Sequence, residues 1–201
     1  MAQKSPTQRY TRLSGEERRA MLIEAGLVCM ARGGIQEFTV DRICAEAGVS
    51  RGLIIHHFGS MNALLTAVYT AIYESSTTLT RSLAQGETRL SALLDAFFAP
   101  EVFNRDAYAI WLTLWSQIAI SAELRAEHRV QYARYVADVA DAIGEVAQAA
   151  GRQIDGEALA RTLICLVDGL GVQHCIEPAS MPAGDAKALC RAALEPHLGE
   201  F

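Results

Sequence analysis

The segment that most constrains this chain is TVDRICAEAGVSRGLIIHHF, residues 39–58. Thr39 is a residue type that caps helix N-termini, and Ser50 can cap a second helix that runs through His57. Between them, Gly48 can end the first helix, because glycine adopts positive φ without strain. The segment therefore predicts two short helices joined by a tight turn, which is a helix-turn-helix.

Apolar spacing supports this reading. Ala47 is small enough for the two helices to cross closely, and Arg51 and His56 fall outside the apolar positions. The predicted shared core with the preceding helix consists of Val40, Ile43, Cys44, Val49 and Ile54. A unit of this kind is typical of DNA-reading heads, and an ordinary helical corner is the alternative that spacing alone leaves open.

The rest of the chain predicts helices only. No run alternates with period two, and Gly and Pro fall between segments of helical periodicity. Pro196 is expected to follow the last helix. The nine predicted helices span 14–32, 39–48, 50–57, 60–83, 87–98, 106–120, 122–150, 155–175 and 183–194. We expect an all-α fold with a DNA-binding head at 1–60 and a ligand-binding and dimerisation body at 61–201, joined through the helix that follows Ser60.

The composition indicates a folded protein, and the charge distribution indicates that its N-terminal part binds a polyanion. Of 201 residues, 51% are hydrophobic and 20% charged. Residues 1–60 hold eight Lys and Arg against six Asp and Glu, whereas residues 61–201 hold ten against seventeen. A basic arm at Lys4, Arg9 and Arg12 adds to the positive end, which suits a nucleic-acid partner.

Location and chemistry are also constrained. No apolar run reaches about 20 residues, and the N-terminus lacks an apolar signal core, so no membrane partner and a cytoplasmic location are expected. Five scattered cysteines without a CxxC pair predict reduced thiols, and no metal or cofactor is expected. A glycine-rich phosphate loop and a nucleophile elbow are both missing from the sequence, so we expect no enzyme.

The stretch AEAGVSRGLIIHHFGSMNALL resembles the DNA-binding head of the TetR family of bacterial repressors. The resemblance covers about the first 70 residues. It implies a homodimer that binds double-stranded DNA at a two-fold symmetric operator, with one recognition helix in each major groove. It places Arg51, Gly52, Leu53 and His56 at the DNA, and Thr39, Ser50 and His57 in contact with, or oriented toward, the DNA backbone.

Two positions depart from the family pattern. Ile55 stands where the family often has Tyr, and Met61 where it often has Lys. Both usual residues touch phosphate, so their loss predicts weaker non-specific affinity and a flatter salt dependence. A second hypothesis is therefore an interaction protein with altered DNA binding. Salt-dependent binding to an operator, seen as a shift in the mobility of the operator DNA, would favour the DNA-binding regulator over this second hypothesis.

The two tryptophans of the body, Trp111 and Trp115, are four residues apart and so share one helix face. Tyr108 lies on the adjoining face. These residues are either core or an aromatic wall for a small-molecule effector, and aromatic cages suit quaternary ammonium groups.

Asp168 is the only charge in the apolar run LICLVDGLG. A buried carboxylate needs a partner or becomes protonated. Asp168 is therefore either hydrogen-bonded to a neighbouring helix or subunit, or a counter-charge for a cationic ligand.

The patterns AIWLTLWSQ, HRVQYARYVADV and LVDGLGVQHCIEP resemble the C-terminal domain of BetI-type repressors. Those repressors respond to choline, so the resemblance implies a choline-like cation and places Trp111 and Trp115 in or beside its pocket. A different apolar or aromatic effector is the alternative.

The last two helices are the best candidates for a dimer interface. Two apolar helices from each subunit can form a four-helix contact, although both faces could instead be internal core. The predicted faces are Leu159, Leu163, Leu166, Val167 and Leu170 on one helix, and Ala188, Leu189, Ala192 and Ala193 on the other.

Overall fold

The computed structural model describes residues 14–201, and the arm predicted at Lys4, Arg9 and Arg12 lies outside them. The described chain contains nine α-helices and one 3-10 helix, with no strand, which confirms the all-α prediction. The elements are α1 (Gly15–Gly33), η1 (Gly34–Gln36), α2 (Val40–Ala47), α3 (Gly52–Phe58), α4 (Met61–Leu83), α5 (Arg89–Phe97), α6 (Arg105–Ile120), α7 (Ala122–Ala149), α8 (Gly156–Ile176) and α9 (Ala183–Leu198).

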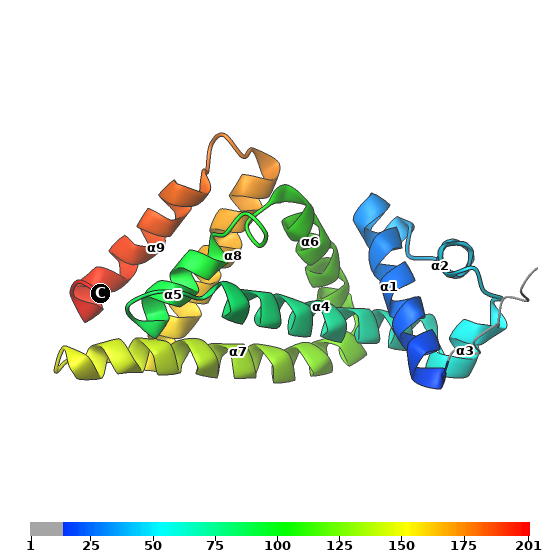
Figure 1. Cartoon of the computed structure of the whole chain (residues 1–201), viewed down its shortest axis with the longest axis horizontal. Coiled ribbons are helices and arrows are strands. Elements are labelled where there is room, and N and C mark those ends of the chain that lie inside the picture. Colours follow the sequence, from blue (N-terminus) through cyan, green and yellow to red (C-terminus); the bar gives the residue numbers. More distant parts are fainter. Residues whose placement is uncertain (1–13) are drawn as a thin grey trace, which may run out of the picture.

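Helices α1, α2 and α3 form a head at one end of the molecule, and α4 runs from this head into the body alongside α7 (Figure 1). The core of the head is not closed off from the body. It contains Ile43, Ile54 and Leu64, and it continues into Leu114 of α6 and Leu124 of α7. A movement of α4 or α6 in the body therefore reaches the head through packed side chains. The domain boundary near residue 60 stays a prediction.

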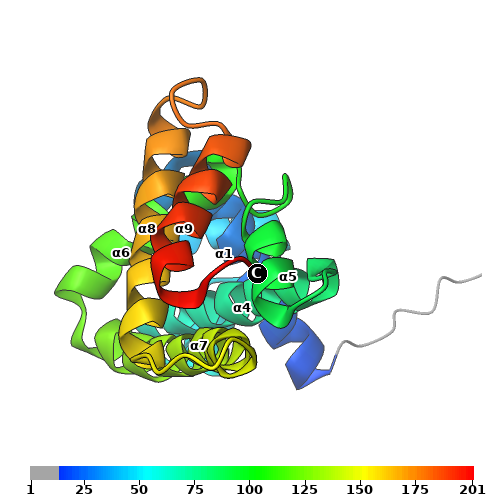
Figure 2. The same cartoon turned by 90° about the vertical axis from the view of Figure 1, so that its left-hand side faces the viewer.

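The second core lies in the body, among α5, α7, α8 and α9. Helices α8 and α9 lie side by side, with α9 on the outside of the bundle (Figures 1 and 2). By length and composition alone, α8 could cross a membrane, since the mean hydropathy of an 18-residue window within it is 1.3. In the fold α8 contacts α6, α7 and α9, and 33% of that window is buried.

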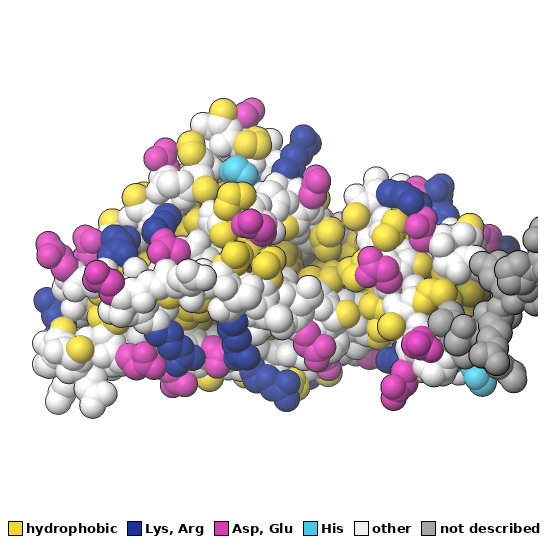
Figure 3. All heavy atoms as spheres, in the orientation of Figure 1, with side chains coloured by type: hydrophobic (Ala, Val, Ile, Leu, Met, Phe, Trp, Pro, Cys, Tyr) yellow, Lys and Arg dark blue, Asp and Glu magenta, His cyan; other side chains and the backbone are white. Residues whose placement is uncertain are grey.

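Charges of both signs are mixed over the molecule. On the face shown in Figure 3, Lys and Arg side chains of the body lie among Asp and Glu side chains, and hydrophobic side chains line the hollow between body and head. Several charged residues are paired across helices, as Arg81 of α4 is with Asp138 of α7 at 2.7 Å. Exposed pairs of this kind add little stability each.

The prediction that Ser50 caps the recognition helix is wrong. Helix α3 begins at Gly52, and Arg51 occupies the capping position in a helical conformation without a side-chain capping bond. The Leu53 N–H donates to the Ser50 carbonyl at 3.0 Å, a bond over three residues. The entry to α3 is therefore a tight turn, and the Ser50 hydroxyl stays exposed.

The predicted end of the last helix is also wrong. Helix α9 continues through Pro196 to Leu198. Proline removes one backbone hydrogen bond there, but Leu194 and Leu198, four residues apart, are both buried. Burial of Leu198, together with a hydrogen bond of 3.1 Å from Arg152 Nη1 to the Pro196 carbonyl, holds the last turn in place.

Candidate DNA-binding and ligand-binding sites

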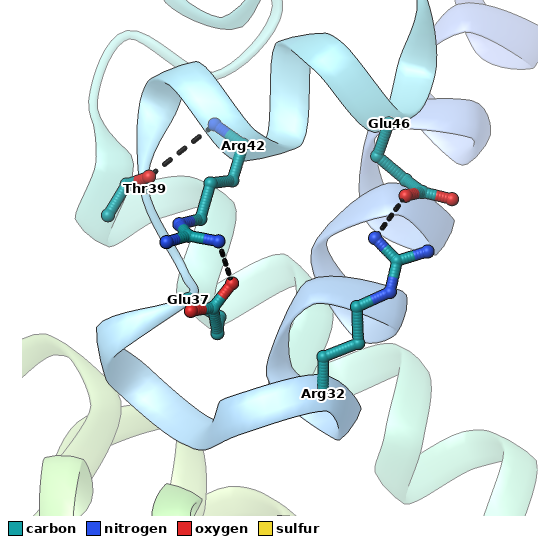
Figure 4. Close-up of polar contacts among 5 residues, drawn as sticks. All are labelled: Arg32, Glu37, Thr39, Arg42 and Glu46. Carbon is teal, nitrogen blue, oxygen red and sulfur yellow. Dashed lines mark hydrogen bonds and ion pairs between the residues drawn. The ribbon is translucent and has the colours of Figure 1, made fainter.

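The head is braced by polar contacts around α2. Thr39 caps this helix as predicted, its hydroxyl accepting from the Arg42 N–H at 3.4 Å. Arg42 also pairs with Glu37, and Arg32 of α1 donates to Glu46 of α2 at 2.6 Å (Figure 4). The Arg32–Glu46 pair joins α1 to the end of α2, and the Arg42–Glu37 pair joins the start of α2 to the segment that precedes it.

The turn between α2 and α3 depends on a glycine. Gly48 has φ +66°, the left-handed conformation predicted for it, and no atom lies within 4 Å of the place a Cβ would occupy. The backbone conformation alone, rather than crowding, therefore favours glycine here. The turn presents α3 at the end of the molecule, with its outer face free of the rest of the head.

Exposed residues on this face include most of those predicted to meet DNA. Arg51 is 73% exposed and pairs with Asp41 at 2.5 Å. An exposed pair is held by roughly 1 kcal/mol or less, so a phosphate or a base edge can compete for the Arg51 guanidinium. The exposed members of the predicted set are Thr39, Ser50, Arg51, Gly52 and His56.

Two of the residues predicted to contact DNA have side chains that are turned toward the head instead. Leu53 is half-buried and packs against the core of the head. His57 is also half-buried, and its Nε2 has no hydrogen-bond partner among residues 14–201, while its carbonyl accepts from Arg19 Nη1 at 3.1 Å. Both residues hold α3 in position. Their side chains are less exposed to DNA than the resemblance implies.

Ile55 lies on the exposed face instead. Its side chain is 58% exposed on α3, beside His56. Met61, the other departure from the family pattern, is half-buried against the head core. An exposed isoleucine offers an apolar surface, of the kind that meets a thymine methyl group in a major groove, so Ile55 belongs with the candidate DNA-facing residues that sequence reasoning did not include.

A cavity of about 700 Å³ lies in the body, between α4, α5, α6, α7 and α8. All four residues predicted to bind ligand, Tyr108, Trp111, Trp115 and Asp168, line it. The structure therefore brings together residues from two helices that are far apart in the sequence. Their role in binding stays a prediction.

The cavity wall is aromatic. Trp111 and Trp115 stack with ring centroids 6.1 Å apart, and Tyr73 meets Trp111 edge to face at 5.8 Å. Tyr135 meets Tyr73 edge to face at 6.3 Å. Such rings present both faces and edges to the space they enclose, and a ring face attracts a cation.

Asp168 is one of four acidic residues that line the cavity, together with Glu87, Glu101 and Asp138. No hydrogen bond or ion pair reaches the Asp168 carboxylate from the described residues, and burial raises its pKa to about 7. The negative charge of Asp168 also contributes to the raised pKa values of Tyr73, Tyr108, Tyr132 and Tyr135. A half-buried carboxylate among neutral rings is therefore available to a positive ligand.

Helix α4 connects the cavity to the head. Tyr69 lines the cavity and is fully buried in the core that the head shares with α6 and α7. Its hydroxyl lies 2.9 Å from His128 Nδ1 of α7. One turn of α4 thus touches the cavity, α7 and the head core together.

Sequence reasoning missed the tyrosines of the cavity. Tyr69 and Tyr73 are four apart on α4, and Tyr132 and Tyr135 are three apart on α7, so each pair shares a helix face. This spacing was visible in the sequence. What it could not show was that these faces turn toward Asp168.

The predicted dimer residues divide between surface and core. Leu163 is fully buried inside its own protomer, so its side chain is not available for contact with a second protomer. Val167 is buried as well. Leu159, Leu166, Leu170 and Ala193 are half-buried, whereas Ala188, Ala192 and Leu189 are exposed. The exposed residues of α8 include Cys165, Gly169 and Ile176, together with the polar Arg161, Thr162 and Gln173.

The sequence was compared with known families and proteins. Residues 22–68 match the TetR family of bacterial regulatory proteins, and residues 86–199 match the C-terminal domain of BetI-type transcriptional repressors. A protein of Vibrio campbellii named HTH-type transcriptional regulator BetI is 26% identical to this chain, and the match covers 91% of this chain and 93% of that protein.

Solved structures agree with the fold. A transcriptional regulator from Pseudomonas aeruginosa PAO1 is 34% identical with a TM-score of 0.82, over 94% of this chain and 93% of that one. A transcriptional regulator from Saccharomonospora viridis, solved in complex with choline, has a TM-score of 0.77 at 23% identity, over 92% of this chain and 100% of that one.

Proposed function

The chain belongs to the TetR family of bacterial transcriptional regulators and carries a BetI-type C-terminal domain, and from this premise we propose that it is a repressor released from DNA by a small organic cation. Regulators of this family bind DNA through the helix-turn-helix head and are not enzymes. The observation that carries the proposal is the cavity in the body, where Asp168 lies among aromatic rings and has no hydrogen-bond or ion-pair partner among residues 14–201.

A quaternary ammonium ion matches this cavity in two ways. Its charge is balanced by the Asp168 carboxylate, and its methyl groups pack on the faces of Trp111, Tyr73 and Tyr135. Each ring face contributes roughly 0.5–2 kcal/mol to a desolvated cation. Choline is the simplest candidate, since the Saccharomonospora viridis regulator of the same fold was solved with it.

Helix α4 transmits the effect of ligand binding from the cavity to the DNA-binding head. A ligand against Tyr69 and Tyr73 favours one position of α4, and α4 carries α3 of the head. The two recognition helices of a dimer then no longer match the spacing of two operator half-sites. The strength of this coupling equals the ligand's preference for one of the two states.

Tryptophan fluorescence tests the ligand. Both tryptophans of the chain line the cavity, so choline is expected to change the emission of Trp111 and Trp115 in a saturable way. The uncharged isostere of choline, in which carbon replaces the quaternary nitrogen, has the same shape and serves as the matched control. Equal affinity for both compounds would show that charge plays no part in recognition.

We also propose that α8 and α9 form the dimer interface. Cys165 and Gly169 are small and exposed on α8, and Leu189 is 49% exposed on the neighbouring helix α9. Small residues allow the helices of two protomers to approach closely, and a two-fold axis lets each patch meet its own copy. A dimer presents two α3 helices to a symmetric operator. The cytoplasmic location expected from the sequence follows from this DNA-binding role and stays a proposal.

Replacing Cys165 with arginine is expected to give monomers, because a charged side chain is placed in an apolar contact while the fold of the protomer is left intact. Operator affinity should then fall at least tenfold. Light scattering after gel filtration reports the mass, and Ala137→Arg on the exposed face of α7 is the control. A Cys165→Arg dimer that binds DNA normally would move the interface elsewhere.

A further inference from the structure

The cavity is much longer than a small ammonium ion requires. Its lining on α4 runs from Tyr69 to Arg81, which is about 18 Å along the helix at the usual rise per residue. On α7 the lining runs from His128 to Val139, or about 16 Å. Helices α4 and α7 lie alongside each other (Figure 1), so the cavity is elongated in their common direction. Its volume of about 700 Å³ is in the range of sites that enclose drug-sized ligands.

The chemistry of the wall changes along this length. Asp168 and the tyrosines whose pKa it influences, Tyr73 among them, lie in one part of the cavity. Beyond Tyr73, the uncharged part of the lining includes Ser76, Thr77, Leu79 and Thr80 of α4, Ala84 just after α4, and Ala92 and Leu93 of α5. The charged residues of the lining other than Asp168 are Arg81, Glu87, Arg89, Glu101 and Asp138.

The arginines at the outer end are already matched by acids. Arg81 pairs with Asp138 at 2.7 Å, and Arg89 pairs with Glu145 at 3.1 Å. Both guanidinium groups therefore already have a carboxylate partner within the protein. The outer part of the cavity also offers apolar and hydroxyl side chains to an uncharged chain, whereas the Asp168 part favours a positive group.

We propose that the effector is a cation with an extended uncharged chain. Its ammonium group lies at Asp168 and its chain follows α4 past Thr77 toward Ala84. This inference rests on the proposed function and narrows its ligand class: choline fills only the Asp168 end, and a long-chain ammonium compound fills the whole cavity. An aliphatic chain on the α4 wall also gains contact with the helix that carries the head.

A series of alkyltrimethylammonium ions tests the proposal. Tetramethylammonium, butyltrimethylammonium and octyltrimethylammonium share one head group and differ only in the chain. Each methylene that becomes buried is expected to raise affinity up to about fourfold, so affinity should increase steadily from the first compound to the third. Calorimetry on the intact dimeric protein, below the micellar concentration of each compound, measures the dissociation constants.

Two neighbouring residues of α4 provide the matched variants. Thr77 lines the cavity one turn beyond Tyr73, whereas Thr78 is exposed and is not part of the lining. Thr77→Phe should abolish most of the gain with chain length, while tetramethylammonium, which does not reach this position, still binds. Thr78→Phe adds the same ring outside the cavity and should retain the full gain.

The outcomes separate the inference from the proposed function. If the short cations bind and release DNA but affinity does not rise with chain length, the extended chain is wrong and the repressor proposal stands. A gain that persists in Thr77→Phe would overturn the proposed path along α4. If no ammonium compound binds at all, the cationic effector itself is wrong.

Discussion

Replacing Asp168 with asparagine is expected to weaken choline binding at pH 8 by about 30-fold or more. The substitution keeps the shape of the side chain and removes only the counter-charge. Losing one partner of a buried charge pair typically costs about 2–5 kcal/mol, and a factor of 30 corresponds to about 2 kcal/mol. Fluorescence titration of wild type and variant measures the change. An Asp168→Asn protein that binds choline as tightly as wild type would remove Asp168 from the site.

The same variant should be more stable than wild type without ligand, but only at higher pH. In the folded protein burial raises the pKa of Asp168 from 3.8 to about 7. The unfolded chain therefore loses this proton at lower pH than the folded one. The wild-type protein loses stability relative to the variant as pH rises from about 4 to about 7, by up to about 4 kcal/mol. The neighbouring tyrosines stay protonated in this range, because burial raises their pKa values too.

Thermal unfolding of both proteins at pH 4 and pH 8 checks this expectation. The difference in Tm should be near zero at pH 4 and clearly positive for Asp168→Asn at pH 8. Choline affinity of the wild type should fall below pH 7 for the same reason, since a proton then competes with the cation. A Tm difference that does not change with pH would mean that Asp168 has a satisfied environment.

Replacing Gly171 with alanine is expected to be the most disruptive single-methyl change in the body. A Cβ at Gly171 would lie 1.8 Å from Tyr108 Cζ, and the Tyr108 hydroxyl donates to the Val167 carbonyl one turn earlier on α8 at 3.2 Å. Either the ring or the whole of α6 must move. Overpacking of this kind costs about 1–3 kcal/mol or more, with about 1 kcal/mol for the hydrogen bond.

A Tm decrease of about 6–12 °C follows for a chain of this size, together with weaker ligand binding, because Tyr108 lines the cavity. Gly144→Ala in α7 is the control, since nothing lies within 4 Å of its Cβ position. That change should be neutral or stabilising, because alanine favours a helix over glycine. If Gly171→Ala unfolds at the wild-type temperature, the close packing of α6 on α8 is not present.

The elements that the sequence predicted correctly depend on local rules. The cap at Thr39 and the turn at Gly48 are set by residues within a few positions, and both appear in the structure. The errors arise where tertiary contacts decide. Pro196 predicts a helix end, yet the buried Leu198 carries α9 past it.

In the candidate ligand site, too, the sequence predicted the residues that stand out locally and missed those that tertiary packing brings together. Asp168 and the tryptophans stand out in the sequence because a charge or a large ring interrupts a simple pattern. Tyr73 and Tyr135 have ordinary helical spacing, and only the packing of α4 against α7 brings them to the same cavity. Leu163 differs from Leu166 by less than one turn, so the sequence alone could not show which of them faces the core.

The central claim is that a cation in the body cavity releases the head from DNA, and one titration tests it most directly. Fluorescence anisotropy of a labelled duplex from upstream of the protein's own gene is followed as protein is added, with and without excess choline. The account predicts that the affinity for the duplex falls as the salt concentration rises and that Arg51→Ala lowers this affinity at least tenfold. It also predicts that choline weakens binding, whereas the uncharged isostere of choline does not. Binding that choline leaves unchanged, although choline is shown to occupy the cavity, would contradict the account.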